Sequence, residues 1–427
     1  MNAFVDILKH RIVVLDGAMG TMIQRYNLSE SDFRGAEFAN HPYRVEGNND
    51  LLVLTRPDII SAIHRQYLEA GADIIETCTF NSQRISQSEY GLQEYIYRLN
   101  FEAARLARAE ADRMSAQTPD KERFVAGSIG PTSKSLTISA DVENPALRDI
   151  DFDTLYNAYA EQIEALMDGG VDLLLVETVF DTLNAKAALM AAERVFVQKN
   201  RRLPLMLSLT VADQAGRTLS GQTLEAVVAS VAHFDLTTIG LNCSFGAENM
   251  EPFLRELSAL TPCYISAYPN AGLPDAMGRY DQTPQMMASA VARFARRGIV
   301  NIVGGCCGST PDHIAAIAEA VEGIAPREVV ARQSAWLAGL EALEPNGAFV
   351  NVGERCNVAG SRKFLRLISE KNYKEALAIA RKQVEDGAMV LDINMDDAMI
   401  DTEAQMVEFL NIMASEPEIA RVPWMVD

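Results

Sequence analysis

The sequence of 427 residues contains no apolar run that approaches the ~20 residues needed for a membrane-spanning helix. Its first residues also lack the charged segment followed by an apolar segment that marks a secretory signal. Only 6 residues are cysteine, too few for a disulfide framework over this length, which indicates a reducing compartment. These absences predict a soluble, cytoplasmic protein without a membrane partner.

Positive charge is scarce as well. Lysine and arginine number 38 against 58 aspartates and glutamates, so the formal net charge is −20. Such a surface repels nucleic acid and anionic lipid over most of its area, and we therefore expect small-molecule chemistry without a nucleic-acid partner. An apolar content of 48% with 22% charged residues is typical of a globular protein, and the length predicts two or three domains.

From Arg11 onward, short apolar runs alternate with longer stretches of helical periodicity. This alternation is typical of βα units around a parallel sheet. The apolar runs before residue 310 are 12–15, 73–76, 124–128, 171–177, 205–209, 237–242, 263–267 and 299–303. Eight strands, each followed by a helix, predict a (β/α)8 TIM barrel, which we assign to residues 1–325.

A short pattern recurs within these units. The segments 70–75, 169–174 and 297–302 each end a helix with glycine and start a strand within about two residues, as a helix C-cap followed by an αβ turn does. A fourth copy, at 385–391, falls after the eighth unit. It is therefore expected to belong to a different domain.

Residues 326–347 are predicted to be an interdomain linker or a final helix around Trp336 and Leu340. Beyond them, the segments 349–355, 389–394 and 424–427 have the character of strands, separated by the helical stretches 373–386 and 402–414. Fewer than three βα units cannot close a barrel. Residues 348–427 are therefore expected to be the truncated start of a second (β/α) barrel, and the chain to be a fragment.

Three cysteines stand at predicted strand ends, Cys243 after the sixth apolar run and Cys306 with Cys307 after the eighth. In a barrel these ends lie on one face, about 10 Å apart, twice the ~4.8 Å strand spacing. Three thiolates favour Zn²⁺, and three protein ligands leave the open position of a catalytic site. Cysteines can also be small packing residues, which we expect for Cys78 and Cys263. The spacing alone leaves both interpretations open.

Polar side chains close other predicted strands. Asp16 follows the first run in a glycine-rich turn, and Glu177 closes the fourth. Two carboxylates at strand ends suit the ammonium group of an amino acid, although they could also be N-caps of the following helices. Thr77 and Thr79 follow the second run and could face a ligand, and Asn270 follows the seventh and is expected at the mouth of the site.

Three motifs together resemble the homocysteine-binding domain shared by cobalamin-dependent methionine synthases and betaine–homocysteine methyltransferases. They are Leu-Asp-Gly-Ala-Met-Gly-Thr at 15–21, Leu-Asn-Cys-Ser at 241–244 and Gly-Gly-Cys-Cys-Gly-Ser-Thr at 304–310. The resemblance covers residues 10 to 325, approximately. It implies that Cys243, Cys306 and Cys307 bind zinc and that homocysteine, as a thiolate, takes the fourth position.

The same resemblance implies that Asp16 and Glu177 bind the ammonium group of homocysteine. Gly17, Thr77, Thr79 and Asn270 complete the set of candidate homocysteine-binding residues. No residue beyond the zinc site is assigned a catalytic role.

The second domain also carries a resemblance. Asn-Val-Gly-Glu-Arg-Cys-Asn at 351–357, Leu-Asp-Ile-Asn at 391–394 and Met-Val-Asp at 425–427 are similar to the first strand ends of the pterin-binding barrel of methionine synthases, dihydropteroate synthases and corrinoid methyltransferases. Acidic and amide side chains can pair with the donor and acceptor edges of a pterin. The candidate pterin-binding residues are Glu354, Asn357, Asp392, Asn394 and Asp427. Cys356 stands where that family is expected to have threonine, and we interpret it as inert.

None of the 5 histidines lies in the Asp-x-His-x-x-Gly pattern of cobalamin-binding modules. The resemblance therefore implies that methylcobalamin is bound by a cobalamin-binding module absent from this chain. The leading hypothesis is a methyltransferase in which homocysteine attacks methylcobalamin to give methionine, with cobalamin recharged from 5-methyltetrahydrofolate. The alternatives are a cobalamin-independent homocysteine S-methyltransferase that uses betaine or S-methylmethionine, and a zinc- or homocysteine-binding fragment without turnover.

Overall fold

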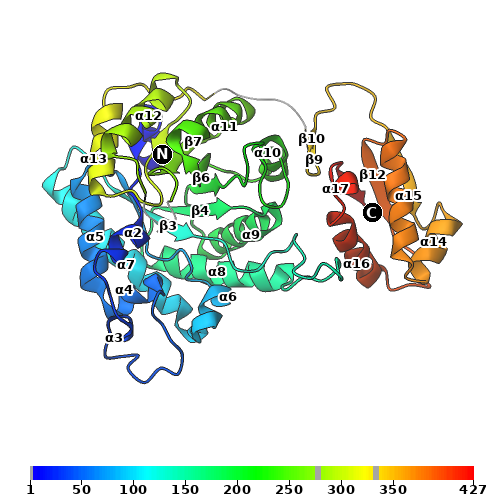
Figure 1. The fold of residues 1–427 in the computed structure, drawn as a ribbon, viewed down its shortest axis with the longest axis horizontal. Coiled ribbons are helices and arrows are strands. Elements are labelled where there is room, and N and C mark those ends of the chain that lie inside the picture. Colours follow the sequence, from blue (N-terminus) through cyan, green and yellow to red (C-terminus); the bar gives the residue numbers. More distant parts are fainter. Residues whose placement is uncertain (1–2, 275–279, 330–335) are drawn as a thin grey trace.

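The computed structural model describes residues 3–274, 280–329 and 336–427. Eight parallel strands form one sheet in the order β1-β8-β7-β6-β5-β4-β3-β2, and a parallel bridge between Leu15 and Ile74 joins its two ends (Figure 1). The sheet is thus a closed barrel, as predicted. Its strands are β1 (Val13–Val14), β2 (Ile74–Glu76), β3 (Phe124–Ile129), β4 (Leu173–Val179), β5 (Leu205–Leu209), β6 (Thr238–Gly246), β7 (Tyr264–Asn270) and β8 (Ile302–Val303).

Helices cover the outside of the barrel, and at least one follows each strand (Figure 1). Among the described residues, a single helix follows each of the third to eighth strands, and these helices are α8 (Phe152–Asp168), α9 (Thr182–Lys199), α10 (Leu224–Val231), α11 (Ala247–Leu260), α12 (Pro284–Arg296) and α13 (Pro311–Val321). The first two connections are longer and contain α2 (Met19–Gln24), α3 (Glu30–Arg34), η1 (Asn49–Leu51), α4 (Leu52–Thr55) and α5 (Pro57–Glu69), then α6 (Arg84–Gln87), η2 (Ser88–Tyr90), η3 (Gln93–Tyr95) and α7 (Ile96–Gln117). Among the described residues, no helix is long and apolar enough to cross a bilayer.

The recurring glycine pattern has a structural reason. Gly71, Gly170 and Gly298 adopt positive φ angles of 104°, 97° and 63° at the turns before β2, β4 and β8. Glycine takes this backbone conformation without the steric cost that a Cβ atom imposes. A polar residue two or three positions after each glycine then accepts a hydrogen bond from the backbone of a neighbouring strand.

The N-terminal helix α1 (Ala3–Ile7) packs into the barrel interior at the amino ends of the strands. Phe4 is 1% exposed and packs edge-on against Phe124 of β3, with 5.4 Å between the ring centroids. Leu8 belongs to the same interior cluster as Ile74 and Met206. Apolar side chains therefore fill the barrel at the amino ends of the strands, and the open end is the one formed by their carboxyl ends.

The C-terminal part has its own apolar core and a three-stranded parallel sheet in the order β11-β12-β13. Its elements are β11 (Val352–Asn357), α14 (Arg362–Ser369), α15 (Tyr373–Glu385), β12 (Val390–Asn394), α16 (Thr402–Ala414), α17 (Pro417–Ala420) and β13 (Trp424–Val426). This is the expected partial (β/α) unit, with α14 and the short α17 as additional helices that the sequence pattern did not predict.

The predicted alternative of a helix around Trp336 and Leu340 is wrong for the described part of that segment. Residues 337–343 form an antiparallel hairpin of β9 (Leu337–Ala338) and β10 (Ala342–Leu343). At its tip, Leu340 accepts a hydrogen bond from Thr223 N beside α10 and donates one to Ala420 O at the end of α17. These hydrogen bonds, one on each side, pair the backbone C=O and N–H groups of Leu340, so the chain here can remain extended. The remaining residues of the expected helix, 330–335, lie outside the described residues.

Candidate active site

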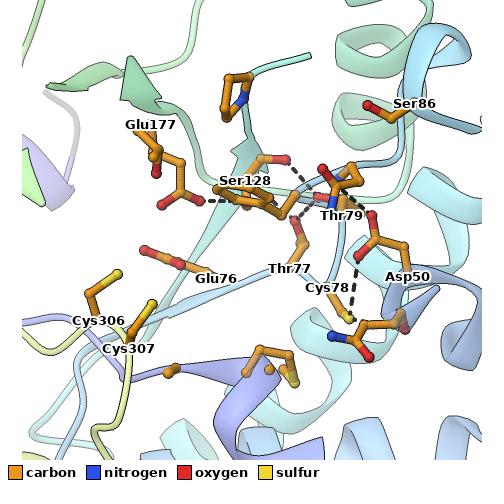
Figure 2. A pocket seen from close by; sticks show the side chains of 18 of the residues that line it. Asp50, Glu76, Thr77, Cys78, Thr79, Ser86, Ser128, Glu177, Cys306 and Cys307 are labelled. Carbon is orange, nitrogen blue, oxygen red and sulfur yellow. Dashed lines mark hydrogen bonds between the residues drawn. The ribbon is translucent and has the colours of Figure 1, made fainter. Parts of the chain in front are cut away.

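A cavity of about 570 Å³ opens at the carboxyl ends of the barrel strands. Its deep part contains the carboxylates of Asp16, Glu76 and Glu177 and the thiols of Cys243, Cys306 and Cys307. Figure 2 shows that Glu177, Glu76 and the pair Cys306 and Cys307 come from different strand ends and point toward the same space. The cavity therefore brings thiol and carboxylate groups together in one place.

The three cysteine sulfurs converge, as the sequence predicted. All three Sγ atoms lie within 4.8 Å of one another, and Cys243 Sγ is 3.9 Å from Cys307 Sγ. The pair that follows β8 is held against β7, since Cys306 N donates to Pro269 O and Ala271 N donates to Cys307 O. None of the cysteines is in a disulfide.

Cys243 reaches this cluster through an irregular strand. We expected β6 to end at Asn242, but it continues to Gly246, with a register shift against β7 between Cys243 and Gly246. Cys243 and Ser244 have left-handed φ angles of 51° and 48°. Such a bulge re-aims side chains next to functional sites. The expected end of the strand was therefore wrong, although the position of the thiol was right.

The sulfur cluster fits one metal ion. Tetrahedral zinc with ~2.3 Å bonds to sulfur holds its sulfur ligands ~3.8 Å apart, close to the 3.9 Å between Cys243 and Cys307. Hydrogen bonds from the thiols of Cys243 and Cys306 lower the pKa of Cys307 below its usual range, whereas the hydrogen bond to Cys307 and burial raise the pKa values of Cys243 and Cys306. The cluster therefore favours a thiolate, the form that binds metal, and three sulfurs leave a fourth ligand position open.

Asp16 and Glu177 are buried beside the sulfur cluster, with 3% and 4% of their surfaces exposed. Asp16 Oδ2 accepts a hydrogen bond from Glu76 N at 3.0 Å, and Glu177 Oε1 accepts one from Ser128 Oγ. Burial raises the pKa of Asp16 well above its usual range and that of Glu177 to about 7. A nearby cation would therefore be strongly favoured.

The alternative that these two carboxylates cap helices is excluded. The N-cap of α2 is Ala18, not Asp16. The N-cap of α9 is Asp181, whose carboxylate accepts from Leu183 N and Asn184 N. Asp16 and Glu177 instead face the cavity.

The remaining candidates for homocysteine binding differ in position. Thr77 and Thr79 line the cavity, but their hydroxyls bond to each other, to Ser128 N and to Ser128 O, and so tie the ends of β2 and β3 together. Asn270 is buried at the end of β7, outside the set of residues that line the cavity. Gly17 lines the cavity and has a packing reason to be glycine, because a Cβ there would lie 2.8 Å from the Tyr67 ring.

Sequence reasoning did not single out two groups of the cavity. Glu76, the last residue of β2, points toward Glu177, Cys306 and Cys307 (Figure 2). Tyr268 of β7 is 2% exposed, and its hydroxyl has no hydrogen-bond partner among the described residues. Glu76 is the last residue of the predicted strand 73–76, and Tyr268 comes directly after the predicted strand 263–267. A local apolar pattern does not show which polar residue at a strand end lines the cavity.

One wall of the cavity mouth comes from the long first connection. Asp50 is buried there and accepts hydrogen bonds from Asn81 N at 2.7 Å and Ser82 Oγ at 3.0 Å. Burial raises the pKa of Asp50 to about 6. Cys78, predicted to be a packing residue, is buried in this wall, and its thiol points to Asn49 O and to Asp50.

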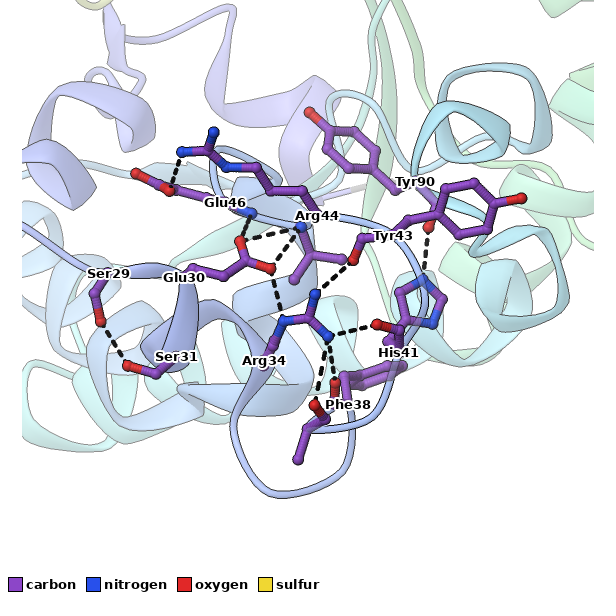
Figure 3. Close-up of polar contacts among 12 residues, drawn as sticks. Ser29, Glu30, Ser31, Arg34, Phe38, His41, Tyr43, Arg44, Glu46 and Tyr90 are labelled. Atoms are coloured by element: carbon purple, nitrogen blue, oxygen red, sulfur yellow. Dashed lines mark hydrogen bonds and ion pairs between the residues drawn. The ribbon is translucent and has the colours of Figure 1, made fainter.

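The connection is held in shape by two charged residues of α3 (Figure 3). Glu30 accepts hydrogen bonds from Val45 N and Glu46 N, and Arg34 donates to His41 O at 2.6 Å and Tyr43 O at 2.8 Å. Figure 3 shows these backbone groups turned inward around the two side chains. The segment before Gly47 is therefore held in one conformation next to residues 47–50, which line the cavity.

Four of the five candidate pterin residues form a second polar group at the carboxyl ends of β11, β12 and β13. Asn357 Nδ2 donates to Asp392 Oδ2 at 3.1 Å, and Asn394 Nδ2 donates to Asp427 Oδ2 at 3.0 Å. Glu354 lies on an irregular part of β11 and is exposed, apart from this group. Cys356 is fully buried in the C-terminal core.

Comparison with known families agrees with this arrangement. The family described as homocysteine S-methyltransferase matches residues 13–321, and the family described as pterin binding enzyme matches residues 353–427. The homocysteine methyltransferase MmuM from Escherichia coli in its metallated form is 26% identical, with a TM-score of 0.55, over 74% of this chain and 98% of that chain. Its oxidized form, 24% identical with a TM-score of 0.56, shares the fold.

Fold and site define a TIM-barrel enzyme with a three-cysteine centre. The chain belongs to the homocysteine S-methyltransferase family and carries a pterin-binding unit after that barrel. The sulfur cluster is consistent with a zinc site.

Proposed function

We propose that this chain is the homocysteine- and folate-binding part of a cobalamin-dependent methionine synthase. The observation that carries the proposal is the convergence of the Cys243, Cys306 and Cys307 sulfurs within 4.8 Å in a cavity that also holds buried carboxylates. The pterin-binding unit in the same chain supports folate as the source of the methyl group. The proposed domains are residues 1–325, a linker at 326–347 and the pterin unit at 348–427.

Zinc would be held by Cys243, Cys306 and Cys307. When bound, it would lower the pKa of a thiol at its open position, so that homocysteine is present as a nucleophilic thiolate near neutral pH. The protein's own residues would orient the rest of the substrate. Asp16 and Glu177 would bind the ammonium group, and Ser128, which donates to Glu177 Oε1, would hold that carboxylate in place.

The reaction is a methyl transfer to sulfur. A lone pair of the homocysteine thiolate attacks the methyl carbon, a carbon–sulfur bond forms, and the bond between the methyl group and its carrier breaks with its electron pair left on the carrier. The cavity of about 570 Å³ exceeds what an amino acid of this size fills. Its outer part, along the rim that contains Asp50, would admit the methyl carrier.

The methyl carrier is proposed to be methylcobalamin on a separate module. None of the 5 histidines of the chain lies in the Asp-x-His-x-x-Gly pattern of cobalamin-binding modules. In the second unit, Asn357, Asp392, Asn394 and Asp427 would bind the pterin ring of 5-methyltetrahydrofolate. The exposed position of Glu354 gives it a weaker claim.

A second candidate is a cobalamin-independent homocysteine methyltransferase. It is favoured by the relative from Escherichia coli, because the match covers 98% of that chain with only 74% of this one. A barrel of this kind is therefore a whole homocysteine methyltransferase in at least one protein. The pterin-binding match at 353–427 counts against it here.

One assay separates the candidates. The zinc-loaded chain is incubated with homocysteine and either free methylcobalamin, S-methylmethionine or betaine, and methionine is quantified. We expect methionine only with methylcobalamin. Turnover with S-methylmethionine or betaine alone would favour the second candidate, and homocysteine binding without methionine from any donor would indicate a binding fragment.

A further inference from the structure

Two carboxylate oxygens in the deep part of the cavity have no hydrogen-bond partner. Asp16 Oδ1 and Glu76 Oε1 are buried, and neither has a partner among the described residues. Both residues line the cavity. Buried polar atoms of this kind are rare in native proteins and usually find their partner in a ligand, an ion or water.

The two oxygens belong to one acidic group with Glu177. Glu76 is the last residue of β2, and its backbone N–H donates to Asp16 Oδ2 at 3.0 Å. The Asp16 carboxylate therefore lies directly beside the backbone of Glu76. Glu177 comes from β4, and Figure 2 shows its carboxylate and that of Glu76 directed toward each other. Burial and repulsion from Glu177 and Asp16 raise the pKa of Glu76 well above its usual range. Three carboxylates so close together, two of them buried, are electrostatically unfavourable unless a cation neutralises them.

The spacing indicates what kind of cation fits. Among the described residues, the cysteines form the group whose possible metal ligands all lie within 4.8 Å of one another, and the three carboxylates do not. A metal ion bound directly by all three carboxylates needs ligand oxygens that lie closer together than these do. An ammonium group is larger, carries three N–H donors and makes hydrogen bonds of ~2.8 to 3.2 Å, so its acceptors can stand as much as ~5 Å apart.

We propose that Glu76 is the third acceptor of the substrate's α-ammonium group, beside Asp16 and Glu177, and that this three-carboxylate site selects α-amino thiols over plain thiols. The inference rests on the proposed function, because it takes homocysteine as the substrate. Each N–H of the ammonium group would meet one carboxylate, which satisfies both unpartnered oxygens at once. A thiol without the amino group would leave these buried oxygens unpaired, and such mismatches give strong discrimination.

The test compares two ligands and two variants on the zinc-loaded chain. The ligands are homocysteine and 4-mercaptobutanoate, which differ only by the amino group, and their dissociation constants are measured by calorimetry. The variants are Glu76→Gln and, as the matched control, Glu89→Gln at the exposed rim of the same cavity, where Glu89 pairs with Ser133. Zinc content and the melting temperature of metal-free and loaded protein report folding independently.

We expect Glu76→Gln to weaken homocysteine binding at least tenfold and to change 4-mercaptobutanoate binding less than twofold. Its melting temperature should not fall, because the carboxylate oxygen it replaces has no partner. Glu89→Gln should leave both constants unchanged. Equal weakening of both ligands, or no change in either, would overturn the role of Glu76 while leaving the proposed function intact. A wild-type chain that binds neither thiol would refute both.

Discussion

Three non-glycine residues with left-handed backbones lie around the candidate site. They are Thr178, Cys243 and Ser244, with φ angles of 57°, 51° and 48°. Each such conformation costs on the order of 1 to 3 kcal/mol and persists only where neighbours enforce it. Asn242 bonds to Thr178 through both ends of its amide, and Ser244 Oγ accepts from Val211 N. These contacts fix the direction in which Cys243 points.

Removal of one sulfur should abolish the proposed metal site. In Cys243→Ser, Cys306→Ser and Cys307→Ser, we expect the bound zinc to fall from one equivalent to near zero after dialysis, with affinity reduced on the order of 100-fold or more. Elemental analysis of the dialysed protein measures this. Cys263→Ser is the matched control, because Cys263 is also partly buried but lies outside the cluster. Full zinc retention in all three cluster variants would refute the site.

His64 should make the fold sensitive to acid. It is fully buried on α5, and neither ring nitrogen has a hydrogen-bond partner among the described residues. Burial lowers its pKa from 6.5 to about 4. Between these values the unfolded chain binds the proton and the folded chain does not, so stability is lost as the pH falls from 6.5 toward 4. At pH 4.5 the loss from this residue is about 2.5 kcal/mol relative to pH 7.5.

Urea unfolding at pH 7.5 and 4.5 tests this for wild type and His64→Phe. The variant should lose about 2.5 kcal/mol less between the two pH values. The exposed His10 provides the matched control, and His10→Phe should behave as wild type. An identical pH dependence in His64→Phe and wild type would show that the buried imidazole does not set the acid sensitivity.

At the scale of the elements, the barrel strands are joined at their amino ends by a repeated side-chain contact. Asp73 Oδ2 accepts from Val14 N, Asp172 Oδ2 from Val125 N, and Asn301 Oδ1 from Ile265 N, all between 2.8 and 2.9 Å. Each acceptor follows a positive-φ glycine and precedes a strand. The contact joins that strand to a neighbour at the point where the sheet pairing begins.

Loss of one such acceptor should destabilise the barrel. In Asp172→Ala, the Val125 N–H is left without its acceptor, and we expect a loss of about 2 kcal/mol in the free energy of unfolding. Asp172→Asn should lose clearly less, because Asn301 shows that an amide oxygen performs the same task. Denaturant unfolding of both variants measures the difference. Equal losses would mean that the ion pair with Arg108 dominates instead.

At the scale of the whole molecule, the C-terminal unit contacts the barrel through the long loop between β3 and α8. Arg148 in this loop donates to Leu136 O within the loop and to Asn411 O of α16, and Asn411 Nδ2 donates to Ala146 O. In Figure 1 the loop extends from the barrel toward α16. The start of the same loop, at Pro131 and Thr132, lines the candidate site. One segment thus contacts both units.

Arg148→Ala should loosen this contact. We expect amide hydrogen exchange in residues 402–414 to become several-fold faster, since Asn411 O loses its charged donor and the loop its internal brace. Hydrogen–deuterium exchange with mass spectrometry measures it. Arg105→Ala is the control, because Arg105 pairs only along its own helix with Glu102 among the described contacts. Unchanged exchange in 402–414 would show that the hairpin at 337–343 holds the C-terminal unit without the loop.

The sequence by itself determined the barrel and the sulfur cluster. Apolar runs and glycine turns are local patterns, and a closed parallel barrel brings all strand ends to one face, so Cys243, Cys306 and Cys307 could be placed together without coordinates. The tertiary structure alone decided the bulge in β6, the hairpin at 337–343 and the place of Glu76 in the site. These features depend on contacts between residues far apart in the chain, and a local pattern carries no information about such partners.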